Sequence, residues 1–381
     1  MSDAGIAEAP TPASRRRFSL NGWRNRLVSS RGFQSWASRF PLTRGTARRE
    51  GEAMFDLVAG FVHSQVLMAL VELGVLDTLR DGPQTLKALA HRHRLADERM
   101  EILAQAGAAL GLLNRRGDRV SLTRRGAALL GVPGLAAMIR HHRVLYRDLE
   151  NPVAFLRGET KPELAGFWPY VFGPGADVDP EAAERYSDLM TDSQALVAEE
   201  TLRAVSFRGT KCLMDVGGGT GVFLASAAQA NPDVSGVLFD LPEVAAQAAR
   251  RFARDGLSDR LSVVPGSFRT DPLPGGADTI SLVRVLYDHS DTTVAALLAA
   301  VFAALPPGGR VVVSEPMSGG ARPDRATDTY FALYTLAMGT GRTRSAARIC
   351  SLLAAAGFAE PRALRTARPF VTSVVTAVRP G

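Results

Sequence analysis

The sequence predicts an α/β protein with a C-terminal doubly wound, Rossmann-like domain and an N-terminal helical, winged-helix domain. Three observations support this fold class: a glycine-rich turn between a strand and a helix, regular alternation of strands and helices after residue 206, and a helix–helix–hairpin unit before residue 131. The expected divisions are a basic arm over residues 1–50, a helical and winged-helix domain over 51–205 and an α/β domain over 206–381.

The glycine-rich turn is Asp215-Val216-Gly217-Gly218-Gly219-Thr220-Gly221. The apolar run Lys211–Met214 precedes it and the alanine-rich stretch Val222–Gln229 follows it, which is the order of strand, turn and helix. Glycine lets the backbone turn sharply and lets a ligand approach where a Cβ would stand. Because NAD, FAD and nucleotide enzymes share such a turn, a second observation must identify the ligand.

The second observation is the apolar strand Val237–Asp240, which ends in a carboxylate 19 residues after Gly221. A carboxylate at that place suits the two hydroxyl groups of an adenosine ribose. The spacing Gly-x-Gly-x-Gly is one residue short of the dinucleotide fingerprint. A ligand with a ribose and no pyrophosphate therefore fits better, and S-adenosylmethionine is the common one.

The C-terminal half predicts a mostly parallel sheet with helices on both faces and one antiparallel strand at the end. Ligands of such sheets bind at the carboxyl ends of the strands. The strands are expected at Leu213–Val216, Val237–Asp240, Leu261–Val264, Thr279–Leu286 and Arg310–Ser314, with a closing hairpin of Arg362–Arg365 and Val371–Val378. The expected rim of the site comprises Gly217, Asp240, Gly266-Ser267-Phe268, Arg284 to His289 and Glu315.

The N-terminal half predicts a winged helix. A helical pattern begins at Glu52, Thr85 can cap a short helix, a second helix begins at Asp97, and Leu112–Arg115 pairs with Arg119–Leu122 in a hairpin. Such a unit could bind DNA, but its second helix begins with acidic residues where phosphates would lie. An interaction or dimerisation module is favoured, and no nucleic-acid partner is expected.

Composition is typical of a globular protein of 381 residues, with 46% apolar and 22% charged residues. Two cysteines exclude a disulfide scaffold and indicate a reducing compartment. The six histidines lack metal-ligand spacing, so no metal is expected. The longest uncharged apolar stretch, Val294–Leu305, is 12 residues long and too short to cross a bilayer, so a cytoplasmic protein is expected.

The net charge of +7 belongs to the arm, because residues 1–50 hold ten arginines and three acids while residues 51–381 hold 35 basic and 35 acidic groups. Ser14–Leu20 is similar to a twin-arginine export signal, but the residues that follow are not apolar. Arginines interleaved with aromatic residues suit peripheral contact with the inner face of an anionic membrane. A mobile tail and packing on a second subunit are the alternatives for the arm.

Farther along the chain, the aromatic segment Phe167–Pro174 could line an apolar pocket or pack between domains.

Four motifs together resemble the plant-type S-adenosylmethionine-dependent O-methyltransferases. They are the glycine turn, Phe239–Val244, Gly266-Ser267-Phe268 followed by Asp271–Pro274, and Arg284–Asp291. The resemblance covers about residues 50–381 and implies a Rossmann-like methyltransferase domain behind a winged-helix dimerisation domain, which in that family forms a homodimer and closes part of the substrate pocket. The basic arm and the segment Arg-Val-Leu-Tyr-Asp-His are most similar to the bacterial members that methylate hydroxylated carotenoids. A methyltransferase of phenols or polyketides and a winged-helix regulator that senses S-adenosylmethionine are the alternatives.

The resemblance implies a set of residues that hold the cofactor, S-adenosyl-L-methionine. Gly217 and its neighbours would approach the methionine end, Asp240 the ribose hydroxyls, and Ser267 and Phe268 the adenine. One departure is Gly266-Ser267, since the family usually has Gly-Asp there. The full cofactor set is Asp215, Gly217, Gly219, Gly221, Asp240, Leu241, Gly266, Ser267, Phe268 and Arg284.

The catalytic residues implied by the resemblance are Tyr287, His289 and Glu315. The family reads Leu-His-Asp-Trp and uses its histidine as the base, whereas here Tyr287 holds that position and His289 follows two residues later. Glu315 matches the first supporting glutamate and Gly341 stands near the place of the second. An apolar substrate with an aliphatic hydroxyl can rely on positioning in a dry pocket, with the proton passing to Tyr287 or His289. Tyr287 is expected to face the substrate and His289 the interior or the dimer partner.

Overall fold

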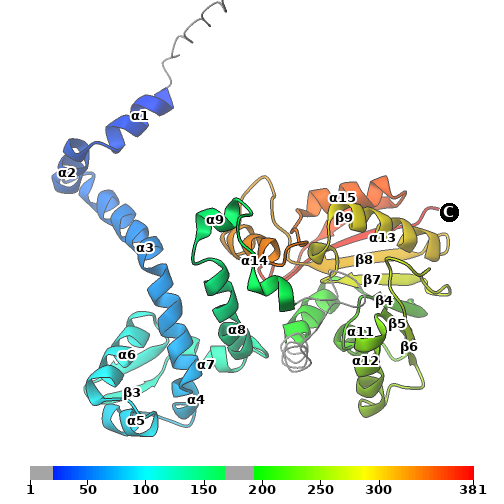
Figure 1. The fold of residues 1–381 in the computed structure, drawn as a ribbon, viewed down its shortest axis with the longest axis horizontal. Helices are drawn as coiled ribbons and strands as arrows, with labels where there is room; N and C mark the ends of the chain where they lie inside the picture. Colours follow the sequence, from blue (N-terminus) through cyan, green and yellow to red (C-terminus); the bar gives the residue numbers. More distant parts are fainter. Residues whose placement is uncertain (1–19, 168–192) are drawn as a thin grey trace, which may run out of the picture. The chain divides into compact units, whose positions relative to one another are not determined.

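The computed structural model describes residues 20–167 and 193–381, and the chain divides into two compact units, residues 1–67 and 68–381 (Figure 1). Trp168–Pro174, most of the aromatic segment singled out in the sequence, lies outside the described residues. Each unit is built from elements whose caps and apolar faces can be read in the sequence.

The first unit contains helices α1 (Leu20–Val28) and α2 (Arg31–Arg39) and most of α3 (Arg44–Glu72). Ser30 caps α2 by accepting a hydrogen bond from the Phe33 backbone, and the rings of Trp36 and Phe40 stack at 4.9 Å. These helices expose many large apolar side chains. They are Leu20, Trp23, Leu27, Val28, Trp36, Phe40, Leu42, Met54, Phe55, Leu57, Val58, Phe61 and Val62.

Helix α3 is long and apolar enough to cross a membrane, by length and composition. The sequence did not single it out because the polar residues His63, Ser64 and Gln65 interrupt its apolar run. Its last residues, including Met68 and Leu70, are buried. The apolar part before them, Met54–Leu67, is about 21 Å long at 1.5 Å per residue, which is shorter than the roughly 30 Å of a bilayer core.

The second unit begins with the predicted winged helix. It consists of α4 (Val75–Thr78), β1 (Gln84–Thr85), α5 (Leu86–Arg92), α6 (Asp97–Ala109), β2 (Leu113–Arg116) and β3 (Arg119–Leu122), with the three strands antiparallel in the order β1-β3-β2. Thr85 caps α5 as predicted, since its side chain accepts from the Ala88 backbone. A Cβ at Gly107 would lie 2.8 Å from Leu113, so glycine lets α6 pack on β2.

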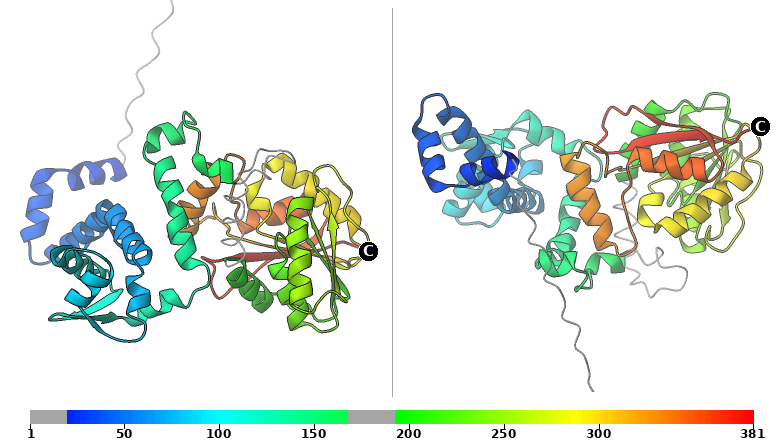
Figure 2. Two further views of the ribbon diagram at one scale, coloured as in Figure 1. Left: turned by 60° about the horizontal axis from the view of Figure 1, so that its bottom comes forward. Right: turned by 90° about the horizontal axis from the view of Figure 1, so that it is seen from above.

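Helices α7 (Arg124–Leu130), α8 (Leu135–Asp148) and α9 (Pro152–Leu156) lead to the short helix η1 (Glu163–Phe167), and residues 193–204 are helical. Both carboxylate oxygens of Asp148, at the end of α8, accept from the η1 backbone at Glu163 and Leu164. Helix α14 (Ala332–Ala337) lies beside α8 (Figures 1 and 2). This contact carries the two histidine–tyrosine pairs described below.

The α/β domain contains a seven-stranded sheet with the order β6-β5-β4-β7-β8-β10-β9. Helices α11 (Val222–Ala230) and α12 (Pro242–Arg254) cover one face, and α13 (Asp291–Ala304) and α15 (Ala346–Ala355) cover the other (Figure 1). The strands are β4 (Cys212–Val216), β5 (Ser235–Asp240), β6 (Leu261–Pro265), β7 (Thr279–Val283), β8 (Arg310–Glu315), β9 (Ala359–Leu364) and β10 (Ser373–Val378). The doubly wound prediction is confirmed.

Strand order and direction locate the site. Strands β4 to β8 are parallel, and the order reverses between β4 and β7, which is where such sheets open a crevice for a ligand. The antiparallel strand expected at the end of the sheet, β10, instead lies between β8 and β9. Strand β10 pairs with β8 on one side and with β9 on the other, so β9 is the edge strand of the sheet.

The expected strand Thr279–Leu286 was too long. Strand β7 ends at Val283, and Arg284 adopts a positive φ of 58°, which interrupts the extended backbone. The 3₁₀ turn η3 (Leu286–Asp288) follows at once. The segment expected at the strand end therefore presents its side chains from a tight turn.

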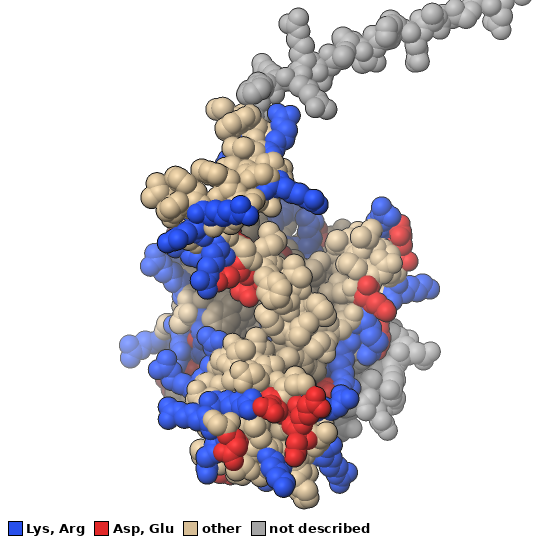
Figure 3. All heavy atoms as spheres, turned by 90° about the vertical axis from the view of Figure 1, so that its left-hand side faces the viewer, with Lys and Arg blue, Asp and Glu red and all other residues tan. Residues whose placement is uncertain are grey.

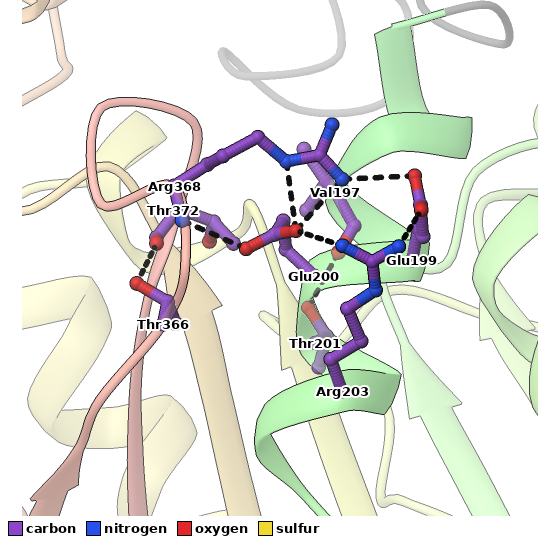
Figure 4. A network of polar contacts seen from close by, with 8 residues as sticks. All are labelled: Val197, Glu199, Glu200, Thr201, Arg203, Thr366, Arg368 and Thr372. Atoms are coloured by element: carbon purple, nitrogen blue, oxygen red, sulfur yellow. Dashed lines mark hydrogen bonds and ion pairs between the residues drawn. The ribbon is translucent and has the colours of Figure 1, made fainter.

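A buried glutamate joins the helical residues before β4 to the connection between β9 and β10 (Figure 4). Glu200 accepts from the backbone and the side chain of Arg368, and Arg203 and Glu199 complete the ion-pair network. Beneath it, the hydroxyl of Thr201 lies 2.6 Å from that of Ser314 in β8. These contacts fix the helical residues 193–204 against the sheet, next to the strand that ends in Glu315.

Candidate active site

The glycine turn after β4 adopts a backbone that other residues would strain. Gly217, Gly219 and Gly221 have φ values of 69°, 60° and 76°. A Cβ at Gly217 would lie 2.9 Å from Val285, and one at Gly221 would lie 2.7 Å from the Phe252 ring. The turn therefore brings bare backbone to the crevice, as the sequence predicted.

Asp240 closes this turn from the end of β5. Its Oδ2 accepts from the Gly219 backbone and its Oδ1 from the Leu241 backbone, both at 2.7 Å. Burial raises the pKa of this carboxyl, while the two backbone donors oppose the shift. Since each carboxylate oxygen has two lone pairs, one on each remains for a ribose hydroxyl.

Asp215 provides a second acceptor at the end of β4. Its Oδ1 accepts from the Ser281 hydroxyl at 2.7 Å, and its Oδ2 is buried with no hydrogen-bond partner among the described residues. Burial raises the pKa of Asp215 to about 7, and the charge of Asp240 adds to the shift. A buried acceptor beside the glycine turn suits the cationic amino group of a methionine moiety.

The adenine position expected from the sequence follows β6. A Cβ at Gly266 would lie 2.6 Å from the Phe239 ring, which keeps this backbone close to β5. Asp271 accepts from the Ser267 backbone at 2.8 Å and so holds the turn. The half-buried Phe268 ring meets the edge of His289 at 5.2 Å, which brings the ends of β6 and β7 together.

His289 is buried, in agreement with the interior placement expected for it. Its Nδ1 lies 3.2 Å from Nη2 of Arg269. Burial lowers the pKa of His289 to about 4, and the charges of Arg269 and Arg344 lower it further. The imidazole is therefore neutral at neutral pH and lies on the side of Phe268.

Tyr287 and Glu315 lie together at the ends of β7 and β8. The Tyr287 backbone donates to Glu315 Oε2 at 3.0 Å, and Glu315 Oε1 has no hydrogen-bond partner among the described residues. The Tyr287 hydroxyl accepts from Arg284 Nε at 3.1 Å, and Arg284 Nη1 donates to Ser193 at 2.9 Å. Burial raises the pKa of the Tyr287 phenol, so the group stays protonated.

Arg344, which the sequence analysis missed, fixes the turn that carries these residues. Its buried guanidinium donates to the carbonyls of Leu286 and His289 and to the Asp291 carboxylate, each at 2.8 Å. The family motifs recognised in the sequence do not include Arg344. An arginine two residues after Arg342 offered no signal of burial, because long charged side chains are mostly exposed.

The sequence analysis also missed two histidine–tyrosine pairs between α8 and α14. His141 Nε2 lies 2.9 Å from the Tyr334 hydroxyl, and His142 Nε2 lies 2.8 Å from that of Tyr330. Tyr330 belongs to the π-helical turn η4 (Ala326–Phe331) that leads into α14. The two histidines had been considered only as metal ligands, although the spacing of four between the tyrosines was a usable signal.

The structure thus brings the expected rim residues to the ends of five neighbouring parallel strands. No cluster of potential metal ligands occurs among residues 20–167 and 193–381. A glycine turn after the first strand, a carboxylate after the second and two buried acceptors fit S-adenosylmethionine. Fold and site together define a methyltransferase of the Rossmann-like class.

Comparison with known proteins identifies the family. The model of an O-methyltransferase domain matches residues 146–359, and that of an O-methyltransferase dimerisation domain matches residues 55–131. The chain belongs to the O-methyltransferase family and is an enzyme that uses S-adenosylmethionine. The match to the dimerisation domain includes the winged helix and supports a homodimer.

Several relatives show how far the similarity extends. The chain is 60% identical to a demethylspheroidene O-methyltransferase of Cereibacter sphaeroides, over 97% of this chain and 98% of that protein. It is 55% identical to a protein of the same name from Rhodobacter capsulatus, over 93% and 88% of the two chains. Among solved structures, a mitomycin 7-O-methyltransferase superposes with a TM-score of 0.73 at 26% identity, covering 88% of this chain and 99% of that one.

Proposed function

We propose that this protein methylates the hydroxyl group of a hydroxylated carotenoid in carotenoid biosynthesis. The observation that carries the proposal is the 60% identity to a demethylspheroidene O-methyltransferase over nearly the whole of both chains. A buried apolar cluster of α8, α9, η1 and α14 residues supports the proposal, because a long apolar substrate needs apolar side chains to pack against.

The bound cofactor supplies an electrophilic methyl group. In our proposal Asp240 holds the ribose, Gly217, Gly219 and Gly221 leave room for the methionine end, and Asp215 accepts from its amino group. The adenine lies against the turn after β6, and Leu241 and Arg284 border the cofactor from the ends of β5 and β7. The turn after β6 consists of Gly266, Ser267 and Phe268.

Tyr287 positions the substrate hydroxyl. Its phenol stays protonated and already accepts from Arg284, so it can relay a proton but cannot retain one as a strong base. Glu315 holds the backbone of Tyr287, and His289 supports the turn from the side of Phe268. Alignment of the reacting atoms supplies most of the acceleration, and favourable intramolecular models give roughly 7–11 kcal/mol for this effect.

In our proposal the functional division is an arm over residues 1–50, a dimerising and capping domain over 51–205 and a methyltransferase domain over 206–381. A second copy covers the apolar residues Phe55, Leu57, Val58 and Phe61, which are exposed here and lie within the match to the dimerisation domain.

The arm places the enzyme at the inner face of an anionic membrane, where an apolar substrate would be found. Residues 20–50 contain seven arginines and one acid, and basic side chains stand among uncharged residues over these helices (Figure 3). Trp23 and Trp36 are 52% and 50% exposed. Arginines and exposed tryptophans on short helices are typical of proteins that adsorb to a charged bilayer surface.

An assay with labelled S-adenosylmethionine tests the substrate. Purified protein is incubated with an acyclic hydroxylated carotenoid, with the same polyene lacking the hydroxyl, and with simple phenols. Label should appear in the carotenoid alcohol alone. Transfer to phenols without transfer to the carotenoid alcohol would contradict the proposal.

Sedimentation with anionic vesicles tests the arm. Deleting residues 1–45 should reduce vesicle binding at low salt, because each arginine near the surface contributes about 1 kcal/mol. Replacing Trp23 and Trp36 by alanine keeps the charge and should reduce the binding that persists at high salt. Vesicle binding unchanged by both would leave the arm as a tail or a dimer contact.

A further inference from the structure

We propose that Tyr334 and His141 form the polar end of the substrate pocket, where Tyr334 binds the substrate hydroxyl and the pair receives its proton. The inference rests on the proposed function, since it assumes an apolar alcohol as substrate. In the family the histidine at the position of Tyr287 takes up the proton. Here we assign that role to His141 on α8, which the proton reaches through Tyr334 on α14.

The pair is a polar point in an apolar wall. His141 on α8 and Tyr334 on α14 approach through Nε2 and Oη at 2.9 Å. Tyr334 belongs to a buried apolar cluster whose other members are Val144, Leu145, Phe155, Leu164, Ala337 and Met338. A polyene with one hydroxyl needs apolar contact along its length and one hydrogen-bonding group at its end, because an unpaired buried hydroxyl costs about 1–3 kcal/mol.

Helix α14 is anchored to the turn that carries Tyr287. A Cβ at Gly341, just beyond α14, would lie 3.0 Å from the Tyr287 carbonyl, and the Arg342 backbone donates to that carbonyl at 2.7 Å. The phenol of Tyr334 interacts electrostatically with Tyr287, Arg284 and Asp288. Helix α14 therefore leads into residues that contact the turn at the carboxyl end of β7, where our proposal places the methyl group.

The protonation states suit a proton acceptor. Burial and, to a smaller extent, the charge of the neighbouring His142 lower the pKa of His141 to about 4. Burial also raises the pKa of Tyr334. At neutral pH both groups are uncharged, so in our proposal the phenol donates to His141 Nε2 and its oxygen lone pairs accept from the substrate hydroxyl.

The transfer then balances without a further reagent. As the hydroxyl oxygen forms its bond to the methyl carbon, the carbon–sulfur bond breaks and leaves its electron pair on sulfur. The hydroxyl proton passes to the Tyr334 oxygen while the phenol proton passes to His141 Nε2. The half-buried imidazolium then loses this proton to water, because its pKa is low.

A second pair of the same chemistry serves as a control. His142 and Tyr330 approach at 2.8 Å, but the Tyr330 hydroxyl lies 3.7 Å from the Met138 sulfur and donates towards it. The Tyr330 hydroxyl therefore already has a partner inside the protein, the Met138 sulfur. Tyr330→Phe in η4 and His142→Gln in α8 make the same chemical changes as Tyr334→Phe and His141→Gln.

Binding provides a test that does not depend on methyl transfer. The affinities of the carotenoid alcohol and of the same polyene without the hydroxyl are measured by absorbance titration. Wild type should prefer the alcohol by about three- to tenfold, the effect of one neutral hydrogen bond. Tyr334→Phe should bring the ratio close to one, and Tyr330→Phe should keep it.

Single-turnover rates separate binding from proton acceptance. His141→Gln keeps a hydrogen-bond acceptor for Tyr334 but cannot take up the proton. It should preserve the preference for the alcohol and slow methyl transfer about a hundredfold, whereas His142→Gln should change the rate less than threefold.

An unchanged preference in Tyr334→Phe, or equal losses in the two tyrosine variants, would overturn the assignment. The proposed function fails separately, if wild type methylates no carotenoid alcohol. In that case the same variants are compared on whichever alcohol or phenol wild type does methylate and on its analogue without the hydroxyl.

Discussion

Replacing Glu315 by glutamine probes a fully buried carboxyl of the site. Glu315 is 0% exposed, and only its Oε2 has a hydrogen-bond donor among the described residues, the Tyr287 backbone. Burial raises the pKa of this carboxyl to about 7, although the Tyr287 backbone and Arg344 oppose the shift. Glutamine has nearly the same shape and keeps a carbonyl oxygen for Tyr287.

The sign of the effect follows from proton linkage. A glutamate in the unfolded chain titrates near 4.5. Since the folded pKa is higher, the stability from this group is fully present below pH 4.5 and is lost as the pH rises to about 7. The difference of about 2.5 units at 1.36 kcal/mol each gives about 3 kcal/mol as an upper value. Glutamine does not titrate, so the variant should gain this amount relative to wild type between pH 4 and 8.

Urea unfolding at several pH values measures the effect as the difference in unfolding free energy between variant and wild type. Asp291→Asn is the matched control of opposite sign. Arg344 lowers the pKa of Asp291, so the stability from that group is present above its unfolded pKa and is lost as the pH falls. The two difference curves should slope in opposite directions.

Parallel curves for wild type and Glu315→Gln would refute the reasoning. They would mean that the ionised carboxylate is satisfied in the folded protein, with Arg344 as the charged group close enough to compensate it. Burial would then not disfavour the ionised form of Glu315. The argument that water is excluded from the site would lose its support.

Further expected outcomes concern the cofactor and the Tyr287 turn. Asp240→Ala should weaken cofactor binding by about 10²–10⁴, because two hydrogen bonds to a charged group are worth about 1.5–3 kcal/mol each, while the exposed Glu243→Ala should have no effect in calorimetry. Tyr287→Phe should slow single turnovers roughly 10²–10⁴-fold if the phenol relays the proton and less than about tenfold if it only positions, and a larger loss in His289→Ala would reverse their roles. Arg344→Lys should lower the unfolding free energy by about 2 kcal/mol in urea, since an ammonium cannot reproduce the three contacts of the guanidinium.

The sequence was sufficient for the parts of the molecule governed by local pattern. Alternating apolar strands and helices determine the doubly wound sheet, and the glycines with positive φ are needed wherever the chain must turn next to a ligand. What escaped depends on distant contacts. The end of β7 follows from the backbone of Arg284, and His141 and Tyr334 are separated by 193 residues. The spacing of Tyr330 and Tyr334 indicates a shared helix face, but nothing in either segment identifies the partner on the other.

The tyrosine in place of the family's histidine has a physical explanation in Arg284. Its guanidinium donates to the Tyr287 oxygen at 3.1 Å and faces the ring at 5.8 Å. An imidazole at position 287 would have to take up a proton beside this fixed positive charge, which disfavours the imidazolium. A phenol stays neutral there and accepts the hydrogen bond that the guanidinium offers. In our proposal the turn after β7 therefore positions a hydroxyl, and the base for its proton lies on another element, away from Arg284.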